Sequence, residues 1–156
     1  MQQKKRIGRA LDSRLSRLLN KSFALHTKGF FIGAIMQKTK TITGVLLSVN
    51  PHNAKAEAKI VTYRDCLEEM YRLIGCECFD CTTLKLGDQL IDAYVDDEGL
   101  MKEPPIALTY IGGRELAGNI LLIGHDDEGN SVSLTKEQID IISSVVSNGV
   151  QVFIMG

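Results

Sequence analysis

A short apolar run, "NILLIGH", restricts the fold of this chain more than any other feature. Residues 120 to 124 contain no charged side chain. Such a continuous run is typical of a strand at the centre of a sheet, where both faces are covered. The sequence therefore predicts a sheet that has this segment in its interior.

Four other segments predict strands of the same sheet. Thr41 to Val49 is rich in β-branched residues, and Asn50-Pro51 is a turn signal that ends it. The segment "AKAEAKIVTY" alternates well enough to pair with it across a loop around His52. Further along, "CFDCTTLKL" and "QLIDAYV" flank Gly87-Asp88, which predicts a hairpin with a tight turn.

Between these two pairs, residues 65 to 75 change to a helical period. Four apolar positions share one face of a helix of about ten residues: Leu67, Met70, Tyr71 and Ile74. Asp65 is expected to cap the first turn while Glu68 reaches back. Gly75 is expected to end the helix, because the position after the last turn commonly needs a positive φ.

A second helix is predicted near the C-terminus. Thr135 and Gln138 can form a capping box, and Leu134 can pack onto Ile139 as a hydrophobic staple. The Asn-Gly pair at 148–149 is expected to end this helix. The segment "VQVFIM" then predicts a last short strand.

The segment "MKEPPIALTYIGGRELAG" has too many Pro and Gly residues for a long element, so it is expected to be a loop with at most one helical turn. The order strand, strand, helix, strands, helix is too irregular for repeated βαβ units. It predicts an α+β fold, in which two helices pack on one face of a mostly antiparallel β-sheet. A chain of 156 residues that is 44% hydrophobic is long enough for one such domain.

Charge is divided unevenly along the chain. Residues 1–35 hold eight Lys or Arg and one Asp, a charge of +7, so the remainder carries −8 within the net charge of −1. This division predicts a basic N-terminal extension at 1–35 and a single α+β domain at 36–156, with Met36 as a candidate natural start. The extension is expected to be a poorly ordered arm.

The functional alternative for this arm is association with nucleic acid or with an acidic membrane surface. Its leucines recur at helical spacing with basic residues between them, which describes a short basic amphipathic helix. Basic side chains attract phosphates in a salt-dependent manner. Six residues of the arm are candidates for nucleic-acid contacts: Lys4, Lys5, Arg6, Arg9, Arg14 and Arg17.

An acidic tetrapeptide occurs twice, as Asp96-Asp97-Glu98-Gly99 and as Asp126-Asp127-Glu128-Gly129. A shared metal or acid/base site would need these carboxylates to converge on fixed supports. Each tetrapeptide, however, follows a predicted strand directly, and Asp residues followed by Gly are typical of a hairpin loop. Both are therefore predicted to be solvated hairpin turns that lie apart, and neither has calcium-loop spacing.

Four cysteines lie close together in the sequence: Cys66, Cys76, Cys78 and Cys81. "CECFDC" contains one Cys-x-x-Cys pair, whereas a zinc site usually draws on a second pair elsewhere. A zinc-stabilised module, completed by His52 or His125, stays an alternative. The main expectation is reduced thiols.

The sequence lacks a phosphate loop, a nucleophile elbow and a His pair at metal spacing. No catalytic, cofactor or metal residues are therefore predicted, and the protein is not expected to be an enzyme. The segment "EPPIALTYIGGRELAG" is the candidate binding loop, since loops on a rigid sheet often carry function, and small-molecule capture in a pocket near it stays a further alternative. Four of its residues are singled out: Pro104, Pro105, Tyr110 and Arg114. The lack of a long apolar span and of a convincing signal peptide predicts a cytoplasmic protein that does not enter a membrane.

Three segments carry a family resemblance: "AYVDDEGLMKEPPIALTY", "GNILLIG" and "DEGNSVSLTKEQIDII". With them the chain resembles the family catalogued as domain of unknown function 3846, over about Thr41 to Ile142. The chain departs from the family pattern at Ile106, where an Asn usually follows the prolines. The resemblance implies a small accessory protein of phages, plasmids or integrated mobile elements, and it brings no catalytic or ligand residues. The sequence is thus interpreted as a non-enzymatic, cytoplasmic binding protein of a bacteriophage or mobile element, with a host or element protein as its partner.

Overall fold

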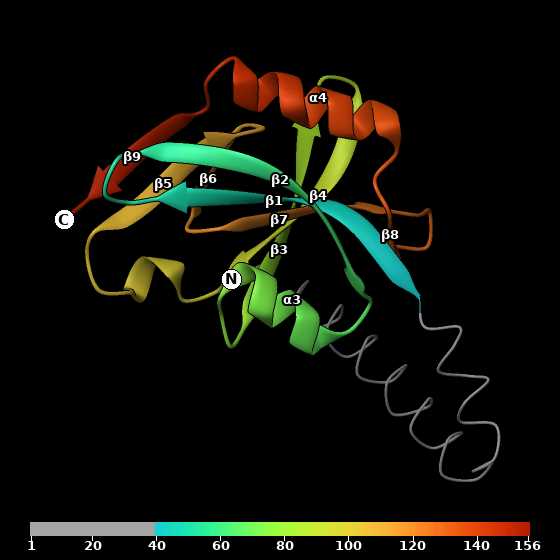
Figure 1. Ribbon diagram of the computed structural model, residues 1–156, viewed down its shortest axis with the longest axis horizontal. Helices are drawn as coiled ribbons and strands as arrows, with labels where there is room; N and C mark the ends of the chain where they lie inside the picture. Colours follow the sequence, from blue (N-terminus) through green and yellow to red (C-terminus); the bar gives the residue numbers. More distant parts are fainter. Residues whose placement is uncertain (1–39) are drawn as a thin grey trace, which may run out of the picture.

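The computed structural model describes residues 40–156, which form two antiparallel sheets and two α-helices (Figure 1). The basic arm, the start at Met36 and the domain boundary after residue 35 lie outside the described residues and stay predictions. Within residues 40–156, neither α-helix is long and apolar enough to cross a membrane.

The larger sheet confirms the predicted α+β class and its mostly antiparallel pairing. Its strands follow the order β2 (Lys55–Arg64), β1 (Thr41–Asn50), β7 (Ile120–His125), β4 (Gln89–Asp96) and β3 (Phe79–Leu86), and β8 (Ser131–Val132) pairs with one end of β7. The apolar run is therefore the central strand, as predicted. Both predicted hairpins are present, with Gly87-Asp88 as the turn between β3 and β4.

A second, smaller sheet corrects the loop predicted for residues 101 to 118. After the 3₁₀ turn η2 (Gly99–Met101), the chain forms β5 (Ile106–Ile111) and β6 (Arg114–Ala117), and the predicted last strand, β9 (Gln151–Met155), pairs with β5. The loop prediction was wrong because Gly112 and Gly113 form the tight turn between two paired strands. Their φ values of 57° and 78° are those of a two-residue hairpin turn.

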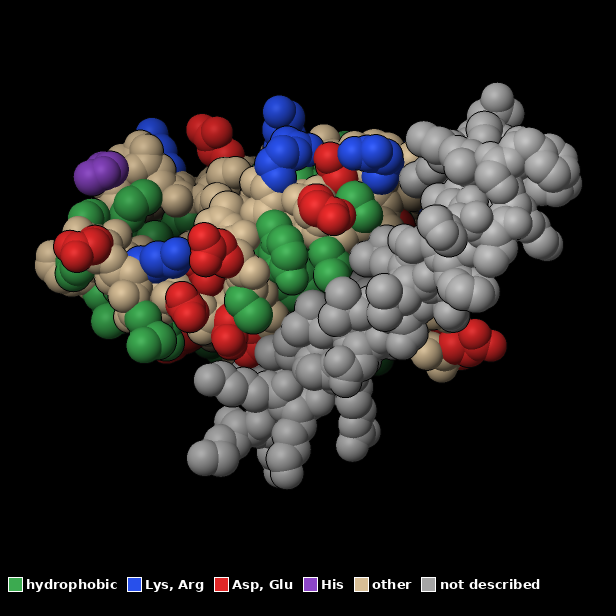
Figure 2. Space-filling view, turned by 90° about the horizontal axis from the view of Figure 1, so that it is seen from below, with side chains coloured by type: hydrophobic (Ala, Val, Ile, Leu, Met, Phe, Trp, Pro, Cys, Tyr) green, Lys and Arg blue, Asp and Glu red, His purple; other side chains and the backbone are tan. Residues whose placement is uncertain are grey.

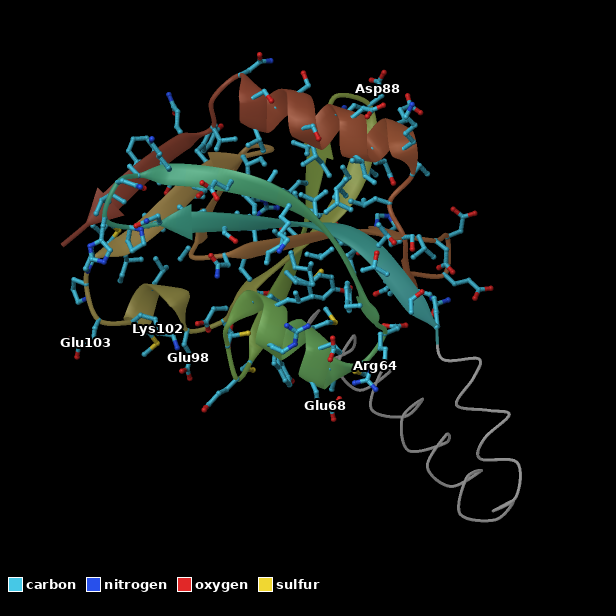
Figure 3. All side chains as sticks on the ribbon, viewed as in Figure 1. Arg64, Glu68, Asp88, Glu98, Lys102 and Glu103 are labelled. Atoms are coloured by element: carbon cyan, nitrogen blue, oxygen red, sulfur yellow. The ribbon has the colours of Figure 1, made fainter. Side chains whose placement is uncertain are left out.

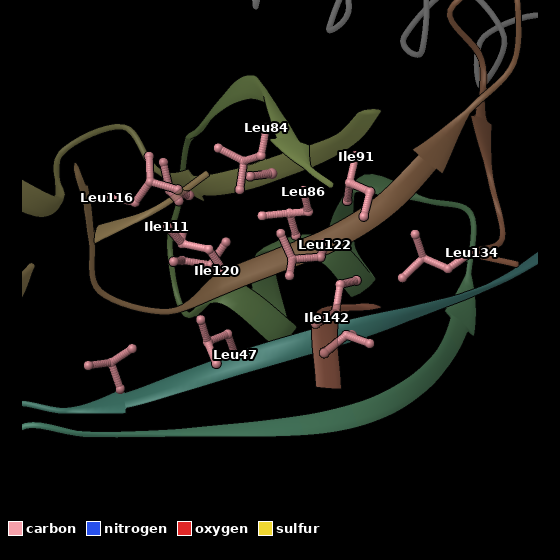
Figure 4. Packing of buried hydrophobic residues seen from close by; sticks show 14 of the residues in the cluster. Leu47, Leu84, Leu86, Ile91, Ile111, Leu116, Ile120, Leu122, Leu134 and Ile142 are labelled. Atoms are coloured by element: carbon pink, nitrogen blue, oxygen red, sulfur yellow. The ribbon is translucent and has the colours of Figure 1, made fainter. Parts of the chain in front are cut away.

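The two α-helices cover opposite faces of the larger sheet, which corrects the prediction that they share one face (Figure 1). Helix α3 (Leu67–Ile74) packs with the side chains of Leu121 and Ile123 in one core cluster. Helix α4 (Lys136–Ser147) packs with Ile120 and Leu122 in another, which also includes residues of the small sheet (Figure 4). Side chains of a strand alternate between its two faces, so an apolar central strand needs cover on both sides.

The ends of the two α-helices confirm some of the predicted capping residues and contradict one. Thr135 and Gln138 form the predicted capping box, with bonds of 3.2 and 2.9 Å. Gly75 ends α3 in the left-handed conformation, as predicted. The predicted Asp65 cap is wrong, because Cys66 is the N-cap residue and no side chain caps α3. The Asp65 carboxylate lies instead 3.8 Å from the Lys40 Nζ atom.

Candidate functional site

The two acidic tetrapeptides lie at opposite ends of the larger sheet. One follows the end of β4 and the other follows the end of β7, and these two strands are antiparallel neighbours. Their carboxylates cannot converge on one ion, so the prediction of separate turns is confirmed. Among residues 40–156, no group of three or more His, Cys, Asp or Glu side chains could hold a metal ion.

The second tetrapeptide is a hairpin turn, as predicted. It connects β7 to β8, and Gly129 has the positive φ that closes it. The Asp126 Oδ1 atom accepts hydrogen bonds from the backbone N–H groups of Glu128 and Asn130, at 3.0 and 2.8 Å. These hydrogen bonds hold the pKa of Asp126 below its usual value, and the bonds from Asn130 have the largest effect. The carboxylate is thus engaged in shaping the turn.

The first tetrapeptide is a turn but not a hairpin, which corrects that part of the prediction. It leads from β4 into η2, and Gly99 has no positive φ. A Cβ at Gly99 would lie 3.0 Å from the Cβ of Ala117, so this glycine permits close packing against β6. The Asp96 Oδ1 atom accepts from the Glu98 N–H at 2.9 Å, and its Oδ2 atom lies 3.3 Å from the Lys102 Nζ atom.

The four cysteines do not form the zinc site considered as an alternative. Cys81 is buried on β3 in the core cluster beneath α3, whereas Cys78 is exposed. His52 lies in the β1–β2 turn, and the His125 Nδ1 atom lies 3.2 Å from a carboxylate oxygen of Asp92. The structure therefore does not bring these side chains together as that alternative would need, because the strand turns Cys81 into the apolar core.

A polar pair that the sequence analysis missed lies within the larger sheet. Asp92 is buried on β4, where its Oδ1 atom accepts a hydrogen bond of 2.9 Å from the Thr83 hydroxyl and faces His125. A carboxylate in the apolar strand "QLIDAYV" was the available signal, since buried charges are normally paired. The Thr83 bond gives the buried carboxylate a partner and links β3 to β4. The His125 Nδ1 atom on β7 lies close to Asp92 but makes no hydrogen bond within residues 40–156.

A cavity of about 340 Å³ opens at the end of the larger sheet where β4 finishes. Its walls come from the end of β1, the last residues of α3, the η2 segment, the start of β5 and the residues before β7. This volume falls in the range of small-molecule sites, roughly 300 to 1,000 Å³. The lining is mostly apolar and includes two charged side chains, Asp96 and Lys102.

The four residues of the candidate binding loop do not form one site. Pro105 lines the cavity, and Pro104 lies against Gly156. Tyr110 is partly exposed on β5, and Arg114 begins β6 directly after the turn. The structure therefore divides the loop between the cavity and the small sheet.

Comparison with known proteins identifies one relationship. The family model described as Domain of unknown function (DUF3846) matches residues 42–147. The chain belongs to this family. The searches of curated proteins and of solved structures found no match. For this DUF3846 chain, the matched residues run from β1 to the end of α4, so β9 follows the matched region.

The free edge of β9 is the most apolar strand edge in the described part of this DUF3846 protein. Sheet edges are also formed by β2, β3 and β6, each of which carries at least two charged residues, and by the two-residue strand β8, which carries no charge but has no exposed residue. Strand β9 carries none, and its last three residues are 51%, 41% and 44% exposed: Phe153, Ile154 and Met155. Natural proteins usually protect exposed edges with charges. An unprotected apolar edge is a template for pairing with another strand.

Two exposed residues of η2, Leu100 and Met101, add apolar surface to the DUF3846 domain. Figure 2 shows green hydrophobic side chains among charged ones at its left end, the end that carries η2 and the C-terminus. Large exposed apolar groups that gather in one region indicate an interaction surface.

The thiol of Cys76 is expected to react slowly with alkylating agents. Burial, and then the negative charge of Asp96, raise its pKa from 9.0 to about 11. Only the thiolate reacts, so at pH about 8 about one Cys76 in 1,000 is reactive, against about one in ten for an unshifted thiol. Alkylation followed by mass spectrometry should show Cys76 modified roughly 100-fold more slowly than the same residue in denaturant. Equal rates in the folded and denatured protein would contradict this expectation.

Proposed function

We propose that this protein is a non-enzymatic binding module that recruits a protein partner by pairing one strand of that partner with β9. The observation that supports this proposal is the uncharged, exposed edge of β9. A strand added to a sheet edge gains main-chain hydrogen bonds, and alternate side chains supply specificity.

The two faces of the small sheet suggest the partner's side-chain pattern. Phe153 lies opposite Leu108 of β5, and Met155 lies opposite Ile106, so these side chains share one face. Ile154 lies opposite the buried Ala107, on the face directed to the core. An added strand with apolar residues at successive positions would meet apolar neighbours on both faces. The partner segment is therefore expected to be extended, apolar and free of charge.

The family resemblance implies that the protein is encoded by a phage, a plasmid or an integrated mobile element. A cytoplasmic location fits a protein that acts on host or element proteins. The acidic balance of residues 36–156 disfavours contact of this domain with phosphate. Binding of nucleic acid through the basic arm stays a prediction, because the arm lies outside the described residues.

The test uses extended apolar peptides selected by display against the full chain. Phe153→Lys and Ile154→Lys should each weaken binding of the selected peptides by about tenfold or more, since a charge would be desolvated at the new edge. Ile60→Lys is the matched control, because Ile60 is 58% exposed on the charged edge strand β2.

Hydrogen exchange locates the bound peptide independently of these variants. Amides of β9 should become protected when the peptide binds, because new inter-strand bonds form there. Selected peptides that bind all three variants equally, or that protect β2 instead of β9, would refute the proposal.

A further inference from the structure

We propose that the cavity at the end of β4 is a binding site for an alkylammonium or alkylguanidinium group, which pairs with Asp96 in place of Lys102. This inference does not depend on the proposed function of β9. It rests on the shape of the cavity, on the hydrogen bonds of Asp96 and on the exposure of Lys102.

The walls of the cavity suit an aliphatic chain. Six apolar residues contribute to the lining: Val49, Pro51, Ile74, Pro105, Ile106 and Ala107. They come from three segments of the chain, 49–51, 74 and 105–107, which hold the walls in place from separate parts of the fold. An unbranched alkyl group would bury apolar surface against these walls, and such burial favours binding.

The polar end of the cavity carries negative charge. The side chain of Asp96 is only 12% exposed, and its Oδ1 atom already accepts from the Glu98 N–H. Its Oδ2 atom is directed to a cation, the Lys102 ammonium group at 3.3 Å. A mostly buried carboxylate repels anions and keeps a cation as its partner.

The C-terminal end of α3 adds to this polarity. Ile74 and Gly75, which end the helix, both line the cavity. A helix C-terminus carries a partial negative charge, and that charge favours cations. Asn119 ties this helix end to the sheet, since its Nδ2 group donates to the Ile74 carbonyl at 3.4 Å and its Oδ1 atom accepts from the Val49 N–H at 3.2 Å. The site is therefore preformed.

Lys102 is a replaceable occupant of this site. Its side chain is 54% exposed, and it lies on the segment after η2 (Figure 3). It also borders the hollow beside α3. An exposed lysine pays side-chain entropy to hold one geometry, so its pair with Asp96 contributes little. A ligand cation with a buried alkyl chain would gain the same charge pairing together with apolar contact. Lys102 would then turn into solvent.

Titration of the full chain with n-butylammonium and n-butylguanidinium, followed by NMR at the amides of Gly75, Gly118 and Asn119, tests the proposal. Both cations should shift these signals, and butyrate should not. Asp96→Asn should weaken binding by about tenfold, since a charge-assisted bond is lost while the amide oxygen can still accept from the Glu98 N–H.

Two further variants separate this site from a general effect of charge. Asp126→Asn is the matched control, because Asp126 accepts from the N–H two residues on in the same way but lies at the other end of the sheet. It should leave the affinity unchanged. Lys102→Gln should strengthen binding of both cations several-fold, because the competitor is removed. Unchanged affinity in Asp96→Asn, weaker binding in Lys102→Gln, or equal binding of butyrate would overturn the proposal.

The cation could come from a free small molecule or from a side chain of a protein. A capped peptide, acetyl-Gly-Arg-Gly-amide, distinguishes these sources. Shifts at the same amides with at least the affinity of n-butylguanidinium would assign the site to an arginine side chain. Binding of the free alkyl cations alone would assign it to a small amine or guanidine. If neither the cations nor the peptide binds, the site is refuted.

Discussion

Replacing Gly44 by Ala is expected to lower the free energy of unfolding by about 3 kcal/mol, near the upper end of overpacking effects. Gly44 lies on β1 beside the central strand β7. A Cβ there would lie 2.5 Å from the Leu122 carbonyl oxygen and 2.8 Å from the Ile123 Cγ2 atom. The first of these obstacles is backbone of the central strand, so relief requires β1 and β7 to separate.

Urea denaturation of Gly44→Ala, followed by circular dichroism, measures this loss. Gly124→Ala is the graded control, since its nearest obstacle is the Val132 Cγ2 atom at 3.1 Å, in the short edge strand β8. The backbone oxygens of Val132 and Ser133 follow at 3.2 and 3.3 Å, so the contacts at Gly124 are all longer than the two closest at Gly44, and Gly124→Ala should be the milder change. Equal stability of Gly44→Ala and the natural protein would mean that β1 and β7 are not packed as closely as the structure shows.

Leu122→Ala is expected to destabilise the fold by about 2–5 kcal/mol, the usual range for a fully buried leucine. The Leu122 side chain is wholly buried on the face of β7 that packs with α4 (Figure 4). Leu121→Ala should have an effect of similar size, because Leu121 is equally buried against α3. The two substitutions remove side chains from different core clusters.

Hydrogen exchange should separate these two variants. Leu122→Ala should increase exchange first in α4, whereas Leu121→Ala should increase it first in α3, since local opening follows lost packing. Leu90→Ala on β4 is the control, because Leu90 is exposed, and it should change stability by less than about 0.5 kcal/mol. If both leucine variants loosened the same helix, the two-faced arrangement would be wrong.

Signals that act within a few residues were read correctly from the sequence. The Thr135–Gln138 capping box, the tight turn at Gly87-Asp88 and the end of α3 at Gly75 all appear in the structure. Each depends on backbone geometry and hydrogen bonds between near neighbours. The predicted Asp65 cap was wrong because Asp65 contacts a distant part of the chain. Its backbone N–H donates to the Lys40 carbonyl oxygen, and its carboxylate lies near the Lys40 ammonium group.

The candidate site could be predicted only in part. Pro105 was singled out as part of a binding loop, and it does line the cavity. A pocket near this segment was one alternative, but its other walls were not predictable, because they come from residues as far apart as Val49 and Asn119. The apolar edge of β9 was equally hidden. The sequence indicated a last strand but not that it would form an edge of a second sheet.

The sequence by itself determined the identity of most elements, their turns, the central position of β7 and the family. Hydrophobic periodicity and turn chemistry are local properties, and they survive in the fold with little change. The tertiary structure decided that the two helices take opposite faces, that "IALTYIGGRELA" pairs as a hairpin, and that Asp96 and Lys102 meet above an apolar cavity. These outcomes depend on how all the apolar surfaces of the chain are buried together. Burial is a property of the whole packed chain and not of any one segment.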